Sequence, residues 1–324
     1  APFTSRLPTI RSAVDIIRQG RCTLVSSIQM QQVLVLSCLI SAFSLSVLYT
    51  DGIRSSDNQM MASGLCLTAA GLAFSYATPV HTLSPVRPLR SIFHPALFLS
   101  IVGQLVIHVF VMNYATELVH AATGEKAAFP EAIPIAKVSE EEKKNASEAQ
   151  RSFWEQGPPF EPCLLNTVIF LIETVQRVCV MLVNYKGRPF MMGSLENKTL
   201  LLSLAALFIG SFMAAFEVVP YLNNKLQFVS MPDDAFRYKV LGLLLFTVVG
   251  TYGWDTLCQF VFAREILLQG YRDSWNVLPK DPKYLEFMAR RVFVVCGIGY
   301  LYMITDGSGF VLVAGYYAYK KGAF

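Results

Sequence analysis

Residues 21–49 constrain the fold more than any other stretch of the sequence. No charged side chain occurs between Arg21 and Asp51, and the stretch is apolar from Val33 onward. An α-helix rises about 1.5 Å per residue, so roughly 20 residues cross a hydrocarbon core about 30 Å thick. Residues 30–49 have that length. We interpret them as a transmembrane helix. The alternative, a buried helix of a large soluble protein, is disfavoured by the similar stretches that follow.

Further apolar runs of comparable length predict a bundle of such helices. The chain has 324 residues, of which 15% are charged, whereas soluble domains carry roughly 25%. We therefore predict an all-α, polytopic helical membrane protein with six transmembrane helices. After the first, the expected spans are residues 60–78, 93–114, 162–183, 199–216 and 236–262. A seventh apolar element, residues 292–319, is either one span or a hairpin that turns at residues 306–309.

The remaining segments suggest a division of the chain into three parts. Residues 1–20 carry Ile10, Val14 and Ile17 at helical spacing between charged side chains, which predicts an amphipathic, stalk-like helix leading into the first span. Residues 21–262 form the predicted six-helix domain, and residues 263–324 form an extra tail. The domain includes a polar loop, residues 115–161, in which Asn145 begins a possible glycosylation sequon.

The distribution of Lys and Arg predicts the topology. Basic residues concentrate in the loops that stay on the cytoplasmic side of a membrane. If each of the six runs crosses once, one side receives the basic segments, which are residues 1–21, 79–90, 184–198 and 263–291. The other side receives residues 50–59, 115–161 and 217–235.

Ionisable and amide side chains inside the apolar runs are the candidate site residues, since such groups are costly at bilayer depth. Glu173 and Arg177 stand four residues apart in the fourth run, with Gln176 beside them. The two charged side chains can pair on one helix face. They form either a polar surface that receives a polar substrate or partner helix, or an internal ion pair that fixes helix packing.

Two further groups of polar side chains occur in the apolar runs. Gln104 and His108 are four residues apart in the third run. We expect an interhelical hydrogen bond there, because a proton relay would need more acidic groups nearby. Gln29, Gln31 and Gln32 stand at the mouth of the first span, where they line a polar cavity or lie at the membrane interface.

Several classes of chemistry find no support in these residues. Neither G-x-x-x-x-G-K-[ST] nor G-x-G-x-x-G occurs, and the seven cysteines and four histidines form no C-x-x-C or H-E-x-x-H pattern. The net charge of +4 is small and dispersed, so we expect no nucleic-acid partner. We predict no metal, magnesium or ATP site in these residues, and we expect lipids as ligands.

Four segments, in order and spacing, resemble the type V-A P-type ATPases. They are IRQGRCTLVSSIQM (17–30), CLISAFSLSVLY (38–49), LLNTVIFLIETVQ (164–176) and NYKGRPF (184–190). The resemblance covers roughly residues 1–262. It implies the last stalk segment and the fifth to tenth transmembrane helices of an endoplasmic-reticulum dislocase, which extracts misinserted transmembrane helices through a membrane cavity by an aspartyl-phosphate cycle.

The departures from that family lead to two hypotheses. The motifs D-K-T-G-T and G-D-G-x-N-D do not occur in these residues, and Glu173 and Arg177 stand where the family usually has uncharged polar residues. The first hypothesis is therefore a non-catalytic membrane subunit that serves as a structural component of a larger complex with other membrane subunits. The alternative is the carboxyl-terminal part of an active dislocase whose substrates are transmembrane helices. The resemblance implies the endoplasmic reticulum, and a processed Ala1 would instead suggest the mitochondrial inner membrane.

Overall fold

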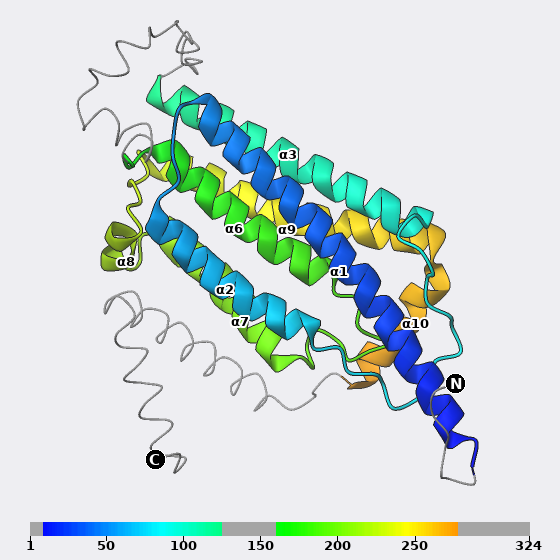
Figure 1. The fold of residues 1–324 in the computed structure, drawn as a ribbon. Coiled ribbons are helices and arrows are strands. Elements are labelled where there is room, and N and C mark those ends of the chain that lie inside the picture. Colours follow the sequence, from blue (N-terminus) through cyan, green and yellow to red (C-terminus); the bar gives the residue numbers. More distant parts are fainter. Residues whose placement is uncertain (1–8, 125–159, 278–324) are drawn as a thin grey trace, which may run out of the picture.

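The computed structural model describes residues 9–124 and 160–277, and these residues form a bundle of helices (Figure 1). The part of the chain that is described contains no β-strand, only an isolated bridge between Pro79 and Met191. The all-α class predicted from the sequence is confirmed. The helices are α1 (Arg11–Thr50), α2 (Asp57–Ser75), α3 (Pro95–Thr123), α6 (Leu164–Asn184), α7 (Lys198–Ala215), α8 (Pro220–Lys225), α9 (Asp234–Phe262) and α10 (Arg264–Val277).

Five helices of the described residues are long and apolar enough to cross a membrane: α1, α3, α6, α7 and α9. The second predicted run forms helix α2, which begins with Asp57, Asn58 and Gln59 and is not among these five. The chain is thus a polytopic helical membrane protein, while the count of six crossings stays a prediction. The seventh apolar element, residues 292–319, and Asn145 lie outside the described residues.

Helix α1 runs without a break from the predicted amphipathic segment into the first span. Its 40 residues correspond to about 60 Å, roughly twice the thickness of the hydrocarbon core. Two arginines near its amino terminus bind the loop between α2 and α3. Arg18 Nη1 donates to the His81 carbonyl at 2.9 Å, and Arg21 Nη1 donates to the Ser84 carbonyl at 2.6 Å.

Helix α3 extends further than the sequence suggested, so the predicted start of the polar loop at Ala115 is wrong. The helix continues to Thr123 because Ala115 and Val119 lie four residues apart on its buried face, where apolar contacts maintain the helical turn. It ends at Gly124, whose φ of +72° is a left-handed conformation that glycine adopts without steric strain.

The core is built around α6, which is buried on nearly all sides. Helices α1, α3, α7 and α9 contact it, and α2 packs mainly on α7 (Figure 1). Helix α3 contacts α9 at Gly103, where a Cβ atom would be 1.8 Å from the indole nitrogen of Trp254. The absence of a side chain at Gly103 therefore lets the Trp254 indole lie directly against α3.

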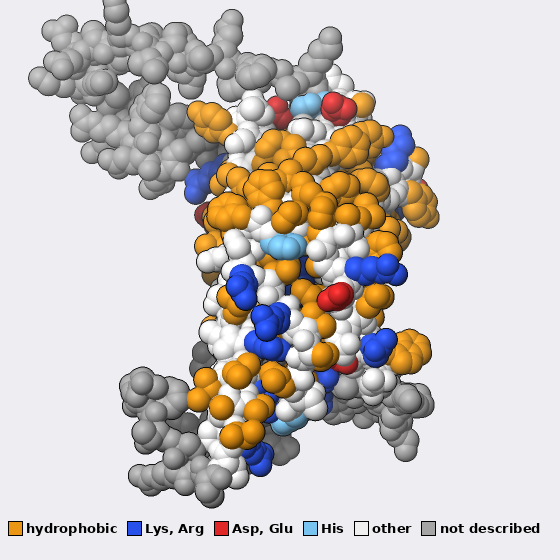
Figure 2. Space-filling model, turned by 90° about the vertical axis from the view of Figure 1, so that its right-hand side faces the viewer, with side chains coloured by type: hydrophobic (Ala, Val, Ile, Leu, Met, Phe, Trp, Pro, Cys, Tyr) orange, Lys and Arg blue, Asp and Glu red, His pale blue; other side chains and the backbone are white. Residues whose placement is uncertain are grey.

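The two ends of the bundle differ in charge. We call one the basic end; it comprises the amino-terminal part of α1, residues 76–94, residues 185–197 and α10. These segments contact one another: Arg18 and Arg21 bind residues 81–86, and the Met192 amide donates to the Thr78 carbonyl at 3.0 Å. Figure 2 shows Lys and Arg side chains gathered below a broad hydrophobic band. The fold thus brings together the basic segments that the sequence assigns to one side of the membrane.

Candidate functional site

Glu173 and Arg177 of α6 form an ion pair that faces α1. One guanidinium nitrogen of Arg177 contacts Glu173 Oε1 and also donates to Ser41 Oγ at 2.9 Å. Ser44 Oγ donates to Glu173 Oε2 at 2.8 Å. The two charged residues are four positions apart, so the helical repeat alone brings them to one face. Ser41 and Ser44 of α1 thus add a hydrogen bond with an uncharged hydroxyl group to each member of the ion pair.

This ion pair lines a small groove between α1, α2 and α6 that has both polar and apolar walls, and we call it the central groove. Its volume is about 120 Å³, and its polar lining includes Gln59 and Ser63 of α2. The side chains of Arg177 and Glu173 remain 26% and 18% exposed. A charge pair that is only partly covered and lies inside a membrane bundle can exchange hydrogen bonds with a polar group entering the groove.

Gln176, the third polar residue of this run, points away from the groove toward α3. Its side chain is fully buried, and its Nε2 donates to the backbone carbonyl of His108 at 2.9 Å. The ring of His108 is also buried, and neither ring nitrogen has a hydrogen-bond partner among the described residues. The structure therefore separates Gln176, which contacts α3, from Arg177 and Glu173, which contact α1.

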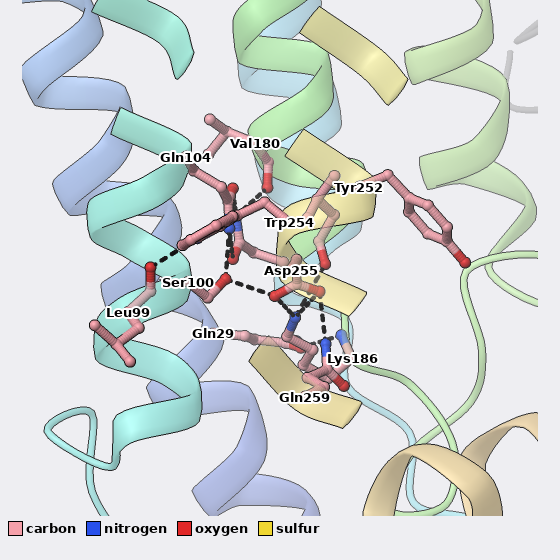
Figure 3. A network of polar contacts seen from close by, with 12 residues as sticks. Gln29, Leu99, Ser100, Gln104, Val180, Lys186, Tyr252, Trp254, Asp255 and Gln259 are labelled. Carbon is pink, nitrogen blue, oxygen red and sulfur yellow. Dashed lines mark hydrogen bonds and ion pairs between the residues drawn. The ribbon is translucent and has the colours of Figure 1, made fainter. Parts of the chain in front are cut away.

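Gln104 forms an interhelical hydrogen-bond pair with Asn184. Asn184 Nδ2 donates to Gln104 Oε1 at 3.0 Å, and Gln104 Nε2 donates to Asn184 Oδ1 at 3.3 Å and to Ser100 Oγ at 2.8 Å. These contacts join α3 to the end of α6 in a fully buried position (Figure 3). Two amides that satisfy each other remove the penalty of burying either one alone.

A second ion pair, which sequence reasoning missed, continues this network toward the basic end. Asp255 of α9 has a side chain only 5% exposed, and Lys186 Nζ lies 2.7 Å from both of its carboxylate oxygens (Figure 3). Ser100 Oγ donates to Oδ1 at 2.6 Å, and Gln259 Nε2 donates to Oδ2 at 2.5 Å. The signal was present, since Asp255 is the only charged residue between Lys239 and Arg264.

Lys186 and Asp255 line a larger space, which we call the basic-end cavity. It has a volume of about 330 Å³ and lies between α1, residues 185–194, α9 and α10. Gln29 lines it and is held in place, since its Oε1 accepts a hydrogen bond from the Lys186 amide at 3.1 Å. Gln32 lines it too, and neither atom of its buried amide has a partner among the described residues.

Gln31 does not line this cavity, although the sequence predicts it beside Gln29 and Gln32. Gln29 and Gln32 are three residues apart and share the inner face of α1, whereas Gln31 is exposed on another face. Successive residues of an α-helix are about 100° apart around the axis, so Gln31 lies about 200° from Gln29 and outside the face that Gln29 and Gln32 share.

The loop that borders the cavity is fixed by a second pair of charges. Arg188 donates from Nε and Nη2 to the two oxygens of Glu196 at 2.9 and 2.8 Å, and the Gly193 amide donates to Glu196 at 2.7 Å. Burial acts to raise the pKa of the Glu196 carboxyl. The hydrogen bonds from Arg188 and Gly193, with the positive charge of Arg188, outweigh it and hold that pKa below its usual value.

The site chemistry of the described residues is hydrogen bonding and charge pairing. Within residues 9–124 and 160–277, no group of three or more His, Cys, Asp or Glu side chains could hold a metal ion. The expected lack of a nucleotide or magnesium site stays a prediction. The arrangement suits recognition of polar groups at membrane depth.

The most informative comparisons are with P-type ATPases of fungi and plants. The chain is 36% identical over 274 residues to the endoplasmic reticulum transmembrane helix translocase of Schizosaccharomyces pombe, covering 85% of this chain and 20% of that protein. The translocase of Saccharomyces cerevisiae is 36% identical over 262 residues, covering 81% and 19%. A probable manganese-transporting ATPase of Arabidopsis thaliana is 33% identical over 267 residues, covering 82% and 20%. No family model matches the chain.

The chain thus spans about a fifth of the length of these relatives. The matches cover about four fifths of the chain, including helices long and apolar enough to cross a membrane. The resemblance seen in four short segments is confirmed over most of the sequence. The chain belongs to the type V-A P-type ATPases and corresponds to part of their membrane-embedded region.

Proposed function

We propose that this chain forms part of the membrane path of an ATP-driven translocase that removes transmembrane helices from the endoplasmic reticulum membrane. Two relatives at 36% identity carry the name of such a translocase. The structural observation that carries the proposal is the central groove, where Glu173 and Arg177 stay partly exposed inside the bundle. In this proposal, phosphorylation and nucleotide binding are performed outside these residues.

The groove offers a physical basis for selecting a substrate helix. A polar group in the hydrocarbon core without a hydrogen-bond partner costs several kcal/mol. Ser63 and the ion pair offer donors and acceptors to such a group, whereas the buried amide of Gln59 is already bonded to Leu226 and Asn166. A transmembrane segment with a polar side chain near its centre gains more from the groove than a wholly apolar one. While no helix is bound, the pairing of Glu173 with Arg177 keeps the net charge of the groove near zero.

Site-specific crosslinking in the complete protein tests this proposal. A photoreactive amino acid is placed at Ser63, which lines the groove, and in a control at Thr68, which is exposed on another face of α2. The probes are a transmembrane peptide with one central Asn and its all-Leu counterpart. We expect the Asn peptide to crosslink at position 63 more than at 68, and more than the Leu peptide does. Equal crosslinking of both peptides at both positions would contradict the proposal.

A structural, non-catalytic role in a larger membrane complex is the second candidate. The internal pairing of Glu173 and Arg177, supported by Ser41 and Ser44, favours it, because a static contact needs no substrate. Purification in mild detergent separates the candidates. Vanadate-sensitive ATP hydrolysis supports the translocase, whereas a stable assembly of unrelated membrane subunits without such hydrolysis supports the structural role.

The names of the relatives favour the endoplasmic reticulum, and they give the mitochondrial inner membrane no support.

A further inference from the structure

The basic-end cavity contains a buried polar side chain whose hydrogen-bonding capacity no described residue uses. Gln32 is 0% exposed, and neither its Oε1 nor its Nε2 has a partner among the described residues. Buried amides in proteins are almost always hydrogen-bonded. The cavity that Gln32 lines measures about 330 Å³, which lies within the roughly 300–1,000 Å³ typical of small-molecule sites. A ligand with both a donor and an acceptor would satisfy this amide.

The charged residues that line the cavity are already paired, which indicates an uncharged ligand. They are Lys186, Arg188 and Asp255. Lys186 contacts both oxygens of Asp255, and Arg188 contacts both oxygens of Glu196. An anionic phosphate would have to displace one of these carboxylates. An uncharged hydroxyl or ester group needs no such exchange.

Two tyrosine hydroxyl groups at the cavity can also form hydrogen bonds with an uncharged ligand. The phenol oxygens of Tyr252 on α9 and Tyr271 on α10 lie 3.0 Å apart, and both residues line the cavity. One phenol donates to the other, so one hydroxyl hydrogen remains free to donate to a ligand. Both side chains are about half exposed, which places these groups where the cavity opens outward.

Apolar side chains also line the cavity, and they reach the surface of the bundle. Val25 and Ile28 of α1 and Ile266 and Leu267 of α10 line it. Leu182 lines it as well and is 39% exposed, so the apolar wall is accessible from outside. The cavity belongs to the basic end, because residues 185–194 and α10 line it, and the end of a membrane bundle lies at the level of the lipid head groups.

We propose that the basic-end cavity binds an uncharged lipid whose head carries hydroxyl groups. The amide of Gln32 hydrogen-bonds to the head, and the apolar part of the lipid lies against Val25, Ile28 and Leu182. Diacylglycerol and sterols share this chemistry. The site is independent of the central groove, so the proposal stands or falls separately from the translocase activity.

Photolabelling of the complete protein in lipid nanodiscs tests the proposal. The probes are a photoreactive diacylglycerol, a photoreactive sterol and a photoreactive phosphatidic acid with the same acyl chains as the diacylglycerol. Labelled peptides are mapped by mass spectrometry. We expect at least one uncharged probe to label the cavity-lining parts of α1 and α10 more strongly than phosphatidic acid does. The diacylglycerol and sterol arms then identify the source of the ligand.

The chain offers a matched pair of variants for this experiment. Gln32→Leu removes the unpartnered amide, and Gln31→Leu makes the same chemical change outside the cavity. One hydrogen bond contributes about 1 kcal/mol, so we expect Gln32→Leu to weaken labelling by the uncharged lipid about five-fold and Gln31→Leu to leave it unchanged. Gln32→Leu should stay folded, because no hydrogen bond between that side chain and a described residue is lost. Labelling that is equal in both variants, or strongest with phosphatidic acid, would overturn the proposal.

Discussion

The ion pair of Asp255 and Lys186 provides the sharpest test of how the bundle is held together. Asn at position 255 preserves the shape of the side chain but removes its charge. Lys186 Nζ then retains the carbonyl of Val183 at 3.2 Å but no carboxylate. The side chain of Lys186 is 19% exposed and that of Asp255 is 5% exposed, so solvent screens their charges little. Removing one partner of a buried pair costs about 3–5 kcal/mol, and we expect Asp255→Asn to destabilise the bundle by about that amount.

The double variant Asp255→Asn with Lys186→Met should lose much less than Asp255→Asn alone, because it leaves no unpaired ammonium group. We expect it to lie within about 1–2 kcal/mol of the parent protein. The assay is reversible unfolding in mixed micelles with increasing denaturing detergent, analysed as a double-mutant cycle. Lys239→Met, at an exposed position of α9, is the control and should change the free energy of unfolding by less than about 0.5 kcal/mol. Equal losses in the single and double variants would refute the reasoning.

Three further predictions concern other parts of the described chain. Gly103→Ala should destabilise the bundle by about 1–3 kcal/mol in the same unfolding assay, because the new methyl group overlaps the indole of Trp254; an unchanged stability would contradict that contact. Glu173→Ala should destabilise the bundle more than the double change Glu173→Ala with Arg177→Ala, since only the single variant leaves a charge unpaired, and equal losses would disprove an energetic role for the pair. The lowered pKa of Glu196 means that its stabilising contribution is present above the usual carboxyl pKa and is lost as the pH falls through the lower folded value. Stability measured against pH should therefore decline less steeply on the acid side in Glu196→Gln, and identical acid limbs would contradict this assignment.

The sequence was informative wherever a pattern within one segment was enough to predict the structure of that segment. Apolar runs long enough to cross a membrane predicted α1, α3, α6, α7 and α9, because helix length and bilayer thickness are fixed quantities. The spacing of Glu173 and Arg177 placed them on one face, because neighbours four residues apart meet on any helix. The end of α3 was misjudged because a short polar segment looked like a loop, while buried Ala115 and Val119 continued the helix.

Contacts between distant segments could not be predicted in the same way. Lys186 and Asp255 are 69 residues apart, and Gln104 and Asn184 are 80 apart. Their pairing depends on how α3, α6 and α9 pack, which no single segment encodes. A lone carboxylate at position 255 signalled that some partner had to exist, but the sequence alone offered several basic residues at the same end.

By itself, the sequence determined the class of protein and the approximate position of each long helix, because hydrophobicity over about 20 residues decides whether a helix enters a membrane. It also determined the family, through the similarity of its segments to known relatives. Only the tertiary structure decided which polar side chains face a shared space. The rotation of each helix about its axis depends on packing against all its neighbours, and a difference of about 100° between adjacent residues separates Gln32 in the cavity from Gln31 on the surface.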